Sequence, residues 1–177
     1  MLTKKLREKG TMLGKIVADD DVPFHNPNLD NLVAQVSQPG VQHYGSCQHK
    51  IVLVDCLTKT NIIRCFLECD LELIRVPWDY DFTTLAYDGL FLSNGPGDPK
   101  MCVPIQHLQK ALVQDRPVFG ICLGSQLMDL AAGSDTFKLK YGHRSHNQPV
   151  KLTGSQHYYI TSQNHGFTVD TATLPAK

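Results

Sequence analysis

The sequence predicts a three-layer α/β fold with a mostly parallel sheet. Four short apolar runs alternate with segments whose apolar residues recur at helical spacing, all between residues 50 and 131. This alternation is typical of right-handed crossovers, which build a parallel sheet that helices cover on both faces. The chain has 177 residues, of which 42% are hydrophobic, so it can bury one core and does not belong to the disordered class.

Each expected strand is a compact apolar run that ends at turn residues. We expect strands at Lys50–Asp55, Leu71–Val76, Asp88–Ser93 and Pro117–Ile121. Helices are expected after the first, third and fourth strands, around residues 60–67, 105–113 and 127–131. Shorter β-like segments follow near residues 136–139, 149–152 and 157–161.

The chain before residue 50 has a different composition. Residues 1–17 have the pattern of a short basic helix interrupted by Gly10, followed by a brief apolar stretch. Residues 18–49 are rich in Asp, Asn, Pro, Gly and Gln, with one helical patch around residues 29–36, so we expect a linker there. The main domain is expected to span residues 50–177.

Charge balance and cysteine content exclude several classes of protein. Lys+Arg and Asp+Glu both number 17, giving a formal net charge of +0, so nucleic acid is not an expected partner. No apolar run approaches the roughly 20 residues that cross a bilayer, and the charged first residues do not form a signal peptide. We therefore expect no membrane association, and a cytoplasmic protein with reduced thiols.

Metal binding is not expected from the cysteines or histidines. The chain has no C-x-x-C pair. Cys65 and Cys69 are four residues apart on an expected helix, but two small buried or half-buried thiols are the better interpretation. His143 and His146 are three residues apart and lack an evident third ligand.

One cysteine lies in a sharp turn between an expected strand and an expected helix. Gly120-Ile-Cys-Leu-Gly124 has the G-x-nucleophile-x-G pattern, with Cys122 in the nucleophile position. The N-terminus of the helix favours the thiolate form of Cys122, and the N–H groups there, Leu123 first, can hold an oxyanion. The Asn94–Pro99 turn is expected at the same carboxyl edge of the sheet, where ligands of such folds bind.

A cysteine nucleophile is normally paired with a histidine that an acid orients. His165 lies in the polar segment Ser162–Phe167, but no Asp or Glu stands two residues beyond it. We therefore expect His165 to line the substrate site rather than to complete a catalytic triad.

Several motifs together resemble the glutaminase part of carbamoyl phosphate synthetase, a class I glutamine amidotransferase. They are Ser93-Asn-Gly-Pro-Gly-Asp-Pro99, Pro117-Val-Phe-Gly-Ile-Cys-Leu-Gly124, His146-Asn-Gln-Pro149 and Ser162-Gln-Asn-His-Gly-Phe167. The resemblance runs over nearly the whole chain and is nearest to the animal multifunctional form of the pyrimidine pathway. It implies the flavodoxin-like fold of that family, in incomplete form, with residues 1–17 as the last stretch of an N-terminal domain.

The resemblance also implies roles for individual residues. Cys122 would attack the side-chain amide of L-glutamine, and the backbone N–H groups of Gly95 and Leu123 would stabilise the oxyanion. The glutamine pocket would be lined by Gly95, Gly97, Leu123, Gln126, Asn164, Gly166 and Phe167. No cofactor is implied in this chain: a synthetase partner, as a separate large chain or a fused domain, would receive the ammonia and use ATP and bicarbonate to make carbamoyl phosphate, for pyrimidine or arginine synthesis.

The chain departs from the family pattern at several positions. Leu57 and Cys69 each replace a glycine, and Ser125 replaces a histidine. The family's Gly-His-Pro-Glu or Phe-His-Pro-Glu segment, which carries the catalytic histidine and glutamate, is expected after the last residue of this sequence. We therefore expect the 177-residue polypeptide alone to hydrolyse glutamine near background, since general acid catalysis typically contributes about 10²–10⁴-fold.

Two other interpretations are open at this point. The chain could be a diverged, non-catalytic fragment that binds glutamine or a synthetase partner. It could also be a flavodoxin-like nucleotide-binding module, but that class needs a glycine-rich turn after the first strand, and the segment from Asp55 to Thr60 contains no glycine.

Overall fold

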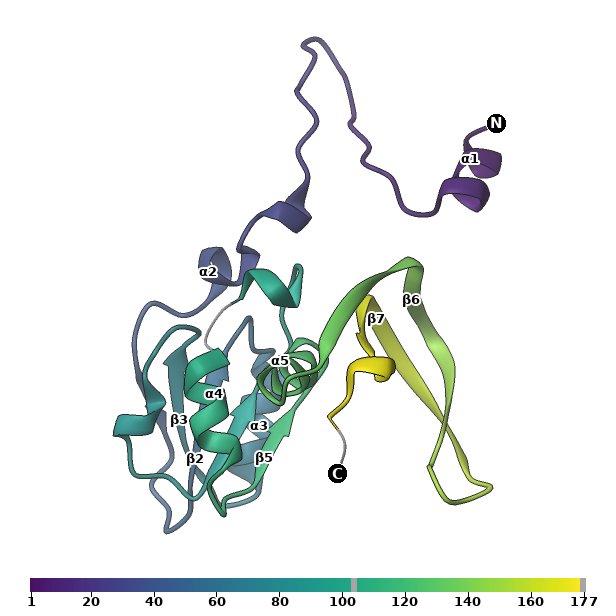
Figure 1. The fold of residues 1–177 in the computed structure, drawn as a ribbon. Coiled ribbons are helices and arrows are strands. Elements are labelled where there is room, and N and C mark those ends of the chain that lie inside the picture. Colours follow the sequence, from purple (N-terminus) through teal and green to yellow (C-terminus); the bar gives the residue numbers. More distant parts are fainter. Residues whose placement is uncertain (103–104, 176–177) are drawn as a thin grey trace. The chain divides into compact units, whose positions relative to one another are not determined.

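The computed structural model describes residues 1–102 and 105–175 (Figure 1). Contacts divide these residues into two compact units. Unit 1 contains Met1–Asn26 and Phe137–Thr168, and unit 2 contains Pro27–Thr136 with Val169 and the residues after it. The expected domain organisation, with residues 1–17, 18–49 and 50–177 as separate parts, remains a prediction.

Unit 2 is built on a five-stranded sheet in the order β1-β3-β2-β4-β5. The strands are β1 (Gln42–Tyr44), β2 (Lys50–Asp55), β3 (Glu72–Pro77), β4 (Gly89–Leu92) and β5 (Val118–Gly120). β2 pairs in parallel with β3 and β4, and β4 pairs in parallel with β5, whereas β1 is antiparallel to β3. The prediction of a mostly parallel sheet is confirmed.

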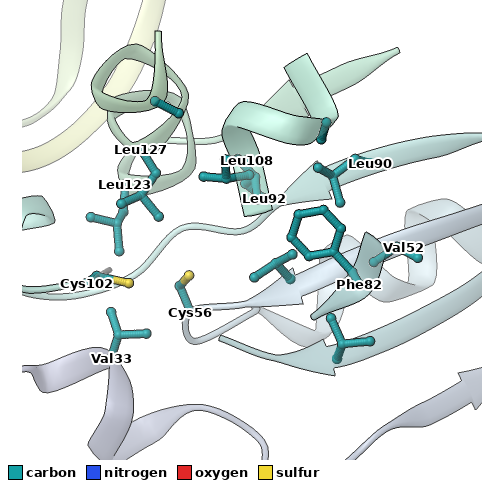
Figure 2. Packing of buried hydrophobic residues seen from close by; sticks show 14 of the residues in the cluster. Val33, Val52, Cys56, Phe82, Leu90, Leu92, Cys102, Leu108, Leu123 and Leu127 are labelled. Carbon is teal, nitrogen blue, oxygen red and sulfur yellow. The ribbon is translucent and has the colours of Figure 1, made fainter. Parts of the chain in front are cut away.

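Helices pack on both faces of this sheet and make the fold three-layered. They are α3 (Thr60–Glu68), α4 (Ile105–Leu112) and α5 (Leu123–Ala131). Side chains alternate along a strand, so Val52 and Val54 of β2 join one apolar cluster while Leu53 joins another. The first cluster includes residues of α4 and α5 (Figure 2), and the second includes Ile63 of α3.

The segment expected to be a linker contributes to unit 2. It contains strand β1, a short 3₁₀ helix (Pro27–Leu29) and helix α2 (Leu32–Val36), which fits the expected helical patch. The side chain of Asn31 caps α2 by accepting a hydrogen bond from the N–H of Ala34 at 3.0 Å. Val33 is only 1% exposed and lies in the main apolar cluster.

Unit 1 contains most of a two-stranded sheet and the first helix, α1 (Leu2–Lys9). The two strands are β6 (Asp135–Lys151) and β7 (Tyr158–Asp170), which pair with each other. The three short β-like segments expected here are therefore parts of two long strands. α1 ends at Gly10 as expected, and the N–H of Thr11 donates to the carbonyl of Lys140 at 2.9 Å.

Three more 3₁₀ helices complete the described elements, at Phe82–Thr84, Pro99–Met101 and Thr171–Thr173. Within the described ranges, no helix combines the length and the apolar character that a membrane span requires.

Candidate functional site

Cys122 occupies the turn between β5 and α5. β5 ends at Gly120, α5 begins at Leu123, and Cys122 is the N-cap residue with φ 53° and ψ −108°. A positive φ is uncommon for a residue with a side chain and stores strain that surrounding structure must hold. The residue is exposed and its thiol is free, so the turn presents a cysteine to solvent at the carboxyl end of a parallel strand.

The two flanking glycines are required by close backbone contacts. A Cβ atom on Gly120 would lie 2.5 Å from the carbonyl carbon of Gly124 and 2.6 Å from the backbone nitrogen of Ser125. A Cβ atom on Gly124 would lie 2.3 Å from the carbonyl oxygen of Leu92 in β4. No side chain fits in either place, so the glycines allow α5 to start directly against the sheet edge.

Hydrogen bonds within the turn hold the backbone of Cys122. Its carbonyl oxygen accepts from the hydroxyl of Ser125 at 2.7 Å and from the N–H of Gln126 at 3.2 Å. The N–H of Gly124 donates to the carbonyl of Ile121 at 2.9 Å. Ser125, which replaces a histidine of the family pattern, therefore serves here as part of the turn.

The ionisation of Cys122 differs from the expectation. Loss of solvating water raises the pKa of the Cys122 thiol, and this outweighs the N–H of Leu123 and the positive charge of Lys59, which both lower it. The stabilising effect of the helix N-terminus is present, as expected, but it does not dominate. The thiol form is therefore favoured over the thiolate at neutral pH.

Gly95 lies directly against the first residue of α5. A Cβ atom on Gly95 would be 2.5 Å from Cδ2 of Leu123 and 2.5 Å from the carbonyl oxygen of Cys56. Two expected oxyanion residues, Gly95 and Leu123, are thus brought together from different connections of the sheet. Gly97 lies farther along the same loop and has φ 88°. A Cβ atom added to Gly97 would lie 3.5 Å from Cβ of Leu32.

The loop that carries Gly95 is anchored by polar groups that the sequence analysis did not single out. The hydroxyl of Ser93 accepts from the N–H of Cys56 at 2.9 Å and donates to the carbonyl of Asn94 at 2.9 Å. The side-chain amide of Asn94 donates to the carbonyl of Leu57 at 3.2 Å. The connections after β2 and β4 are therefore tied to each other beside the cysteine turn.

Asp55, at the carboxyl end of β2, was also missed. Its buried carboxylate accepts from the N–H groups of Gln38 at 2.7 Å and Thr58 at 2.7 Å and from the guanidinium of Arg75 at 2.9 Å. Burial raises the pKa of Asp55, but the hydrogen bonds from Thr58 and Gln38 and the charge of Arg75 lower it further, below its ordinary value. An acidic residue that directly ends a buried apolar run was the signal available in the sequence.

Gln126, expected to contact glutamine, is only 8% exposed and lies in the first turns of α5. It belongs to unit 2 with Gly95, Gly97, Cys122 and Leu123. The other three expected pocket residues, Asn164, Gly166 and Phe167, belong to unit 1 and lie on β7.

Arg144 of β6 lies next to two of the three expected pocket residues of unit 1. Its Nη1 donates to Oδ1 of Asn164 at 3.0 Å, and its Nη2 would lie 3.2 Å from a Cβ atom added to Gly166. Phe167 is buried, and the ammonium of Lys138 lies 5.9 Å from the centre of its ring. The pairing of two long strands brings the side chain of Arg144 within hydrogen-bond distance of Asn164, and this contact could not be deduced from three short β-like segments.

The histidines of the hairpin bond to each other and to the backbone. Nε2 of His165 lies 3.2 Å from Nδ1 of His143 and 3.1 Å from Oε1 of Gln163, and its Nδ1 lies 2.8 Å from the carbonyl oxygen of Phe167. Nδ1 of His146 lies 2.9 Å from the hydroxyl of Ser162. In the described part of the chain, no group of three or more His, Cys, Asp or Glu residues is placed to hold a metal ion.

A cysteine on a strained turn between a parallel strand and a helix, in a sheet of this order, is the arrangement of an enzyme class that uses a cysteine nucleophile. Residues 52–177 match the family described as glutamine amidotransferase class-I, and the chain belongs to that family. A GMP synthase protein from Thermoplasma acidophilum has the same fold, with a TM-score of 0.61 and 24% sequence identity; the match covers 72% of this chain and 68% of that one.

Curated relatives are large proteins of which this chain matches one part. The chain is 48% identical to the multifunctional protein CAD of Squalus acanthias, over 98% of this chain and 8% of the relative. It is 45% identical to the mitochondrial carbamoyl-phosphate synthase (ammonia) of Homo sapiens, over 99% of this chain and 12% of the relative. It is 41% identical to the multifunctional protein ura1 of Schizosaccharomyces pombe, over 98% of this chain and 9% of the relative. The chain thus spans about a tenth of the length of these relatives.

Proposed function

We propose that this chain is the glutamine-hydrolysing part of a carbamoyl phosphate synthetase. The observation that carries the proposal is the turn of Cys122: an exposed thiol at positive φ, between two glycines that admit no side chain, next to the contact of Gly95 with Leu123. Family membership and the relatives named above support the same assignment. Family membership and the relatives do not favour the diverged, non-catalytic alternative, for which only the departures at Leu57, Cys69 and Ser125 speak.

The proposed reaction begins with attack of the Cys122 sulfur on the side-chain amide carbon of glutamine. The carbon–nitrogen bond breaks, the thiol proton ends on the nitrogen, and ammonia leaves behind a glutamyl thioester. Water then cleaves the thioester, giving glutamate and restoring the thiol. The N–H groups of Gly95 and Leu123 would stabilise the negative oxygen of both tetrahedral intermediates, a contribution of about 10²–10³-fold for one such donor.

The remaining proposed roles concern glutamine binding. In unit 2, Gly97 and Gln126 would line the glutamine pocket. The family resemblance alone gives the same role to Asn164, Gly166 and Phe167 of unit 1. Arg144 donates to the amide oxygen of Asn164 and so would fix which face of that amide is available to a ligand.

The proposed destination of the ammonia is a synthetase partner, either a separate large chain or a fused domain, that uses ATP and bicarbonate. We favour pyrimidine over arginine synthesis on the resemblance to the animal multifunctional form of the pyrimidine pathway, and we propose a cytoplasmic location.

Covalent labelling with a chloroketone analogue of glutamine tests the proposal. The thiolate of Cys122 displaces chloride and forms a thioether, so the test requires the nucleophile and the pocket but no hydrolysis. We expect the label on Cys122 alone, protection by glutamine, and no protection by asparagine. Cys122→Ser should abolish labelling, and Cys65→Ser, at an exposed thiol on α3, should leave it unchanged.

The rate of labelling should rise with pH through the raised pKa of Cys122, because only the thiolate reacts. Labelling spread over all exposed cysteines, or labelling of Cys122 that glutamine does not reduce, would contradict the proposal, since either result means that no glutamine pocket surrounds this thiol.

A further inference from the structure

Cys56 and Cys102 form a buried pair of thiols that the proposed reaction does not use. Cys56 follows β2 and is 0% exposed, and Cys102 follows the 3₁₀ helix Pro99–Met101 and is 1% exposed. The two side chains influence each other, since the neighbouring Cys102 raises the pKa of the Cys56 thiol. Figure 2 shows the two sulfur atoms next to each other, with Val33 on one side and Leu123 on the other.

We propose that Cys56 and Cys102 form a reversible disulfide that switches off the candidate active site. In this step the two thiols lose two hydrogen atoms and a sulfur–sulfur bond forms. A small disulfide oxidant such as glutathione disulfide accepts the two electrons and two protons and leaves as two thiols. A dithiol reductant reverses the reaction. The inference of switching rests on the proposed function, whereas formation of the bond does not.

The position of the pair links it to the expected oxyanion residues. A Cβ on Gly95 would lie 2.5 Å from the carbonyl oxygen and 2.8 Å from Cβ of Cys56. Gly95 and Cys102 lie in the same connection between β4 and α4, and Ser93 ties the start of that connection to the N–H of Cys56. The disulfide would therefore fix the connection that carries Gly95 at Cys102, in addition to the hydrogen bond that already holds it at Ser93.

The loop around Gly95 has no room to absorb such a change. Sulfur atoms in a disulfide are about 2.05 Å apart, closer than two thiols that are not bonded, so the side chains of Cys56 and Cys102 and the backbone that carries them must adjust. Gly95 is packed so closely against Cys56 and Leu123 that not even a Cβ fits there. The proposed switch is that this adjustment displaces the N–H of Gly95 relative to that of Leu123, so that the two no longer bind one oxyanion.

Burial sets the conditions under which the pair reacts. The neighbouring Cys102 and burial raise the pKa of Cys56, so Cys56 stays an unreactive thiol in the closed structure. Oxidation then requires local opening of the connection that carries Cys102, and its rate should increase as the pH rises.

The test compares the wild-type chain with Cys102→Ser and with Cys69→Ser, a matched change at an exposed thiol. Each protein is equilibrated with reduced and oxidised glutathione and mapped by mass spectrometry without reduction. We expect a Cys56–Cys102 cross-linked peptide in wild type and Cys69→Ser and none in Cys102→Ser. If both cysteines remain alkylatable after unfolding while the exposed thiols are oxidised, the pair is structural only and the proposal is wrong.

Two further measurements separate the switch from the proposed function. Deuterium uptake by residues 94–101 should change by at least roughly threefold on oxidation of wild type and not of Cys102→Ser, whatever the protein does with glutamine. Chloroketone labelling of Cys122 should fall by at least about tenfold in the oxidised wild type only; any mixed disulfide on Cys122 lowers labelling equally in both proteins.

If the Cys56–Cys102 cross-link forms but deuterium uptake by residues 94–101 stays unchanged, the proposed switch is wrong, even when the chloroketone labels Cys122 of the reduced protein. Absence of labelling in the reduced protein would contradict the proposed function alone, and the cross-link and deuterium uptake would still decide the conformational change. Cys102→Ala serves as a second variant if Cys102→Ser does not fold.

Discussion

Leu57 follows β2 in a backbone conformation that side chains rarely adopt, with φ at 107°. Its side chain is 45% exposed, so little packing compensates the strain, which is of the order of 1–3 kcal/mol for such a residue. We predict that Leu57→Gly stabilises the chain by about 1 kcal/mol, because the relief of strain exceeds the roughly 0.5–1 kcal/mol that the greater freedom of glycine costs. Urea unfolding measures the difference.

Cys69→Gly is the matched control, because Cys69 also replaces a glycine of the family pattern but has φ −94°. Without strain to relieve, this change should lower the free energy of unfolding by about 0.5–1 kcal/mol. Equal losses in both variants would show that the backbone at Leu57 is not strained.

Asp55 holds three separate segments through one carboxylate, which makes it the most consequential buried charge beside the site. We predict that Asp55→Asn lowers the free energy of unfolding by about 3–5 kcal/mol, since it leaves the guanidinium of Arg75 without its charged partner. Asp115→Asn, at an exposed carboxylate, should change stability by less than about 0.5 kcal/mol. A small loss in Asp55→Asn would mean that the amide replaces the carboxylate in every hydrogen bond.

The same residue predicts a dependence of stability on pH. The pKa of Asp55 is lower in the folded chain than its ordinary value of 3.8, so the unfolded chain binds the proton first as the pH falls. The stabilisation is complete above the ordinary pKa and is lost as the pH drops through the folded pKa. Chemical unfolding between neutral and acidic pH should show a weaker pH dependence in Asp55→Asn than in wild type.

At the residue scale, local patterns could be predicted from the sequence and collective effects could not. The glycines around Cys122 indicate a tight turn because their spacing is local. Whether the pKa of Cys122 is raised or lowered depends on how much solvating water all neighbouring segments remove. The hydrogen bond that Ser93 accepts depends on Cys56, which folding brings close. Neither the pKa shift nor this hydrogen bond can be deduced from the residues next to Cys122 or Ser93 in the sequence.

Among the elements, the contact of α5 with the sheet edge is the most sensitive to substitution. We predict that Gly124→Ala lowers the free energy of unfolding by about 1–3 kcal/mol, because its methyl group would lie 2.3 Å from the carbonyl oxygen of Leu92. Gly40→Ala is the control, since a Cβ there meets nothing within 4 Å. Thermal unfolding of both variants measures the effect, and a loss in Gly40→Ala as large as in Gly124→Ala would argue against the steric explanation.

The central strands β2, β3 and β4 were predicted within one residue because they are short, mostly apolar segments whose side chains are largely buried. β1 was not predicted. Gln42, His43 and Tyr44 form no apolar run, and they become a strand only by pairing with β3, where Tyr44 faces Leu73 in the register. Edge strands of this kind depend on a partner distant in sequence, and composition alone therefore indicated a linker.

Over the whole molecule, apolar burial is concentrated in unit 2. Of the residues in β6 and β7, only Thr136 and Phe167 are buried, whereas β2 has four buried residues in a row. This difference also explains why the long hairpin was expected as three short segments: without a buried face, its sequence shows no sustained alternation of apolar and polar residues.

This distribution predicts unequal local stability in the two units. We expect the amides of β2 and β4 to exchange with deuterated water at least about tenfold more slowly than those of β6 and β7, since opening a segment costs less when it exposes little apolar surface. Exchange followed by mass spectrometry on the whole chain measures this. Leu53→Ala should speed exchange in β2–β4 and leave the hairpin unchanged, because Leu53 is 0% exposed, while Leu152→Ala, at a 51% exposed residue, should affect neither. Equal protection of all strands in the wild-type chain would mean that the two units unfold as one, and the uneven burial would then carry no consequence for stability.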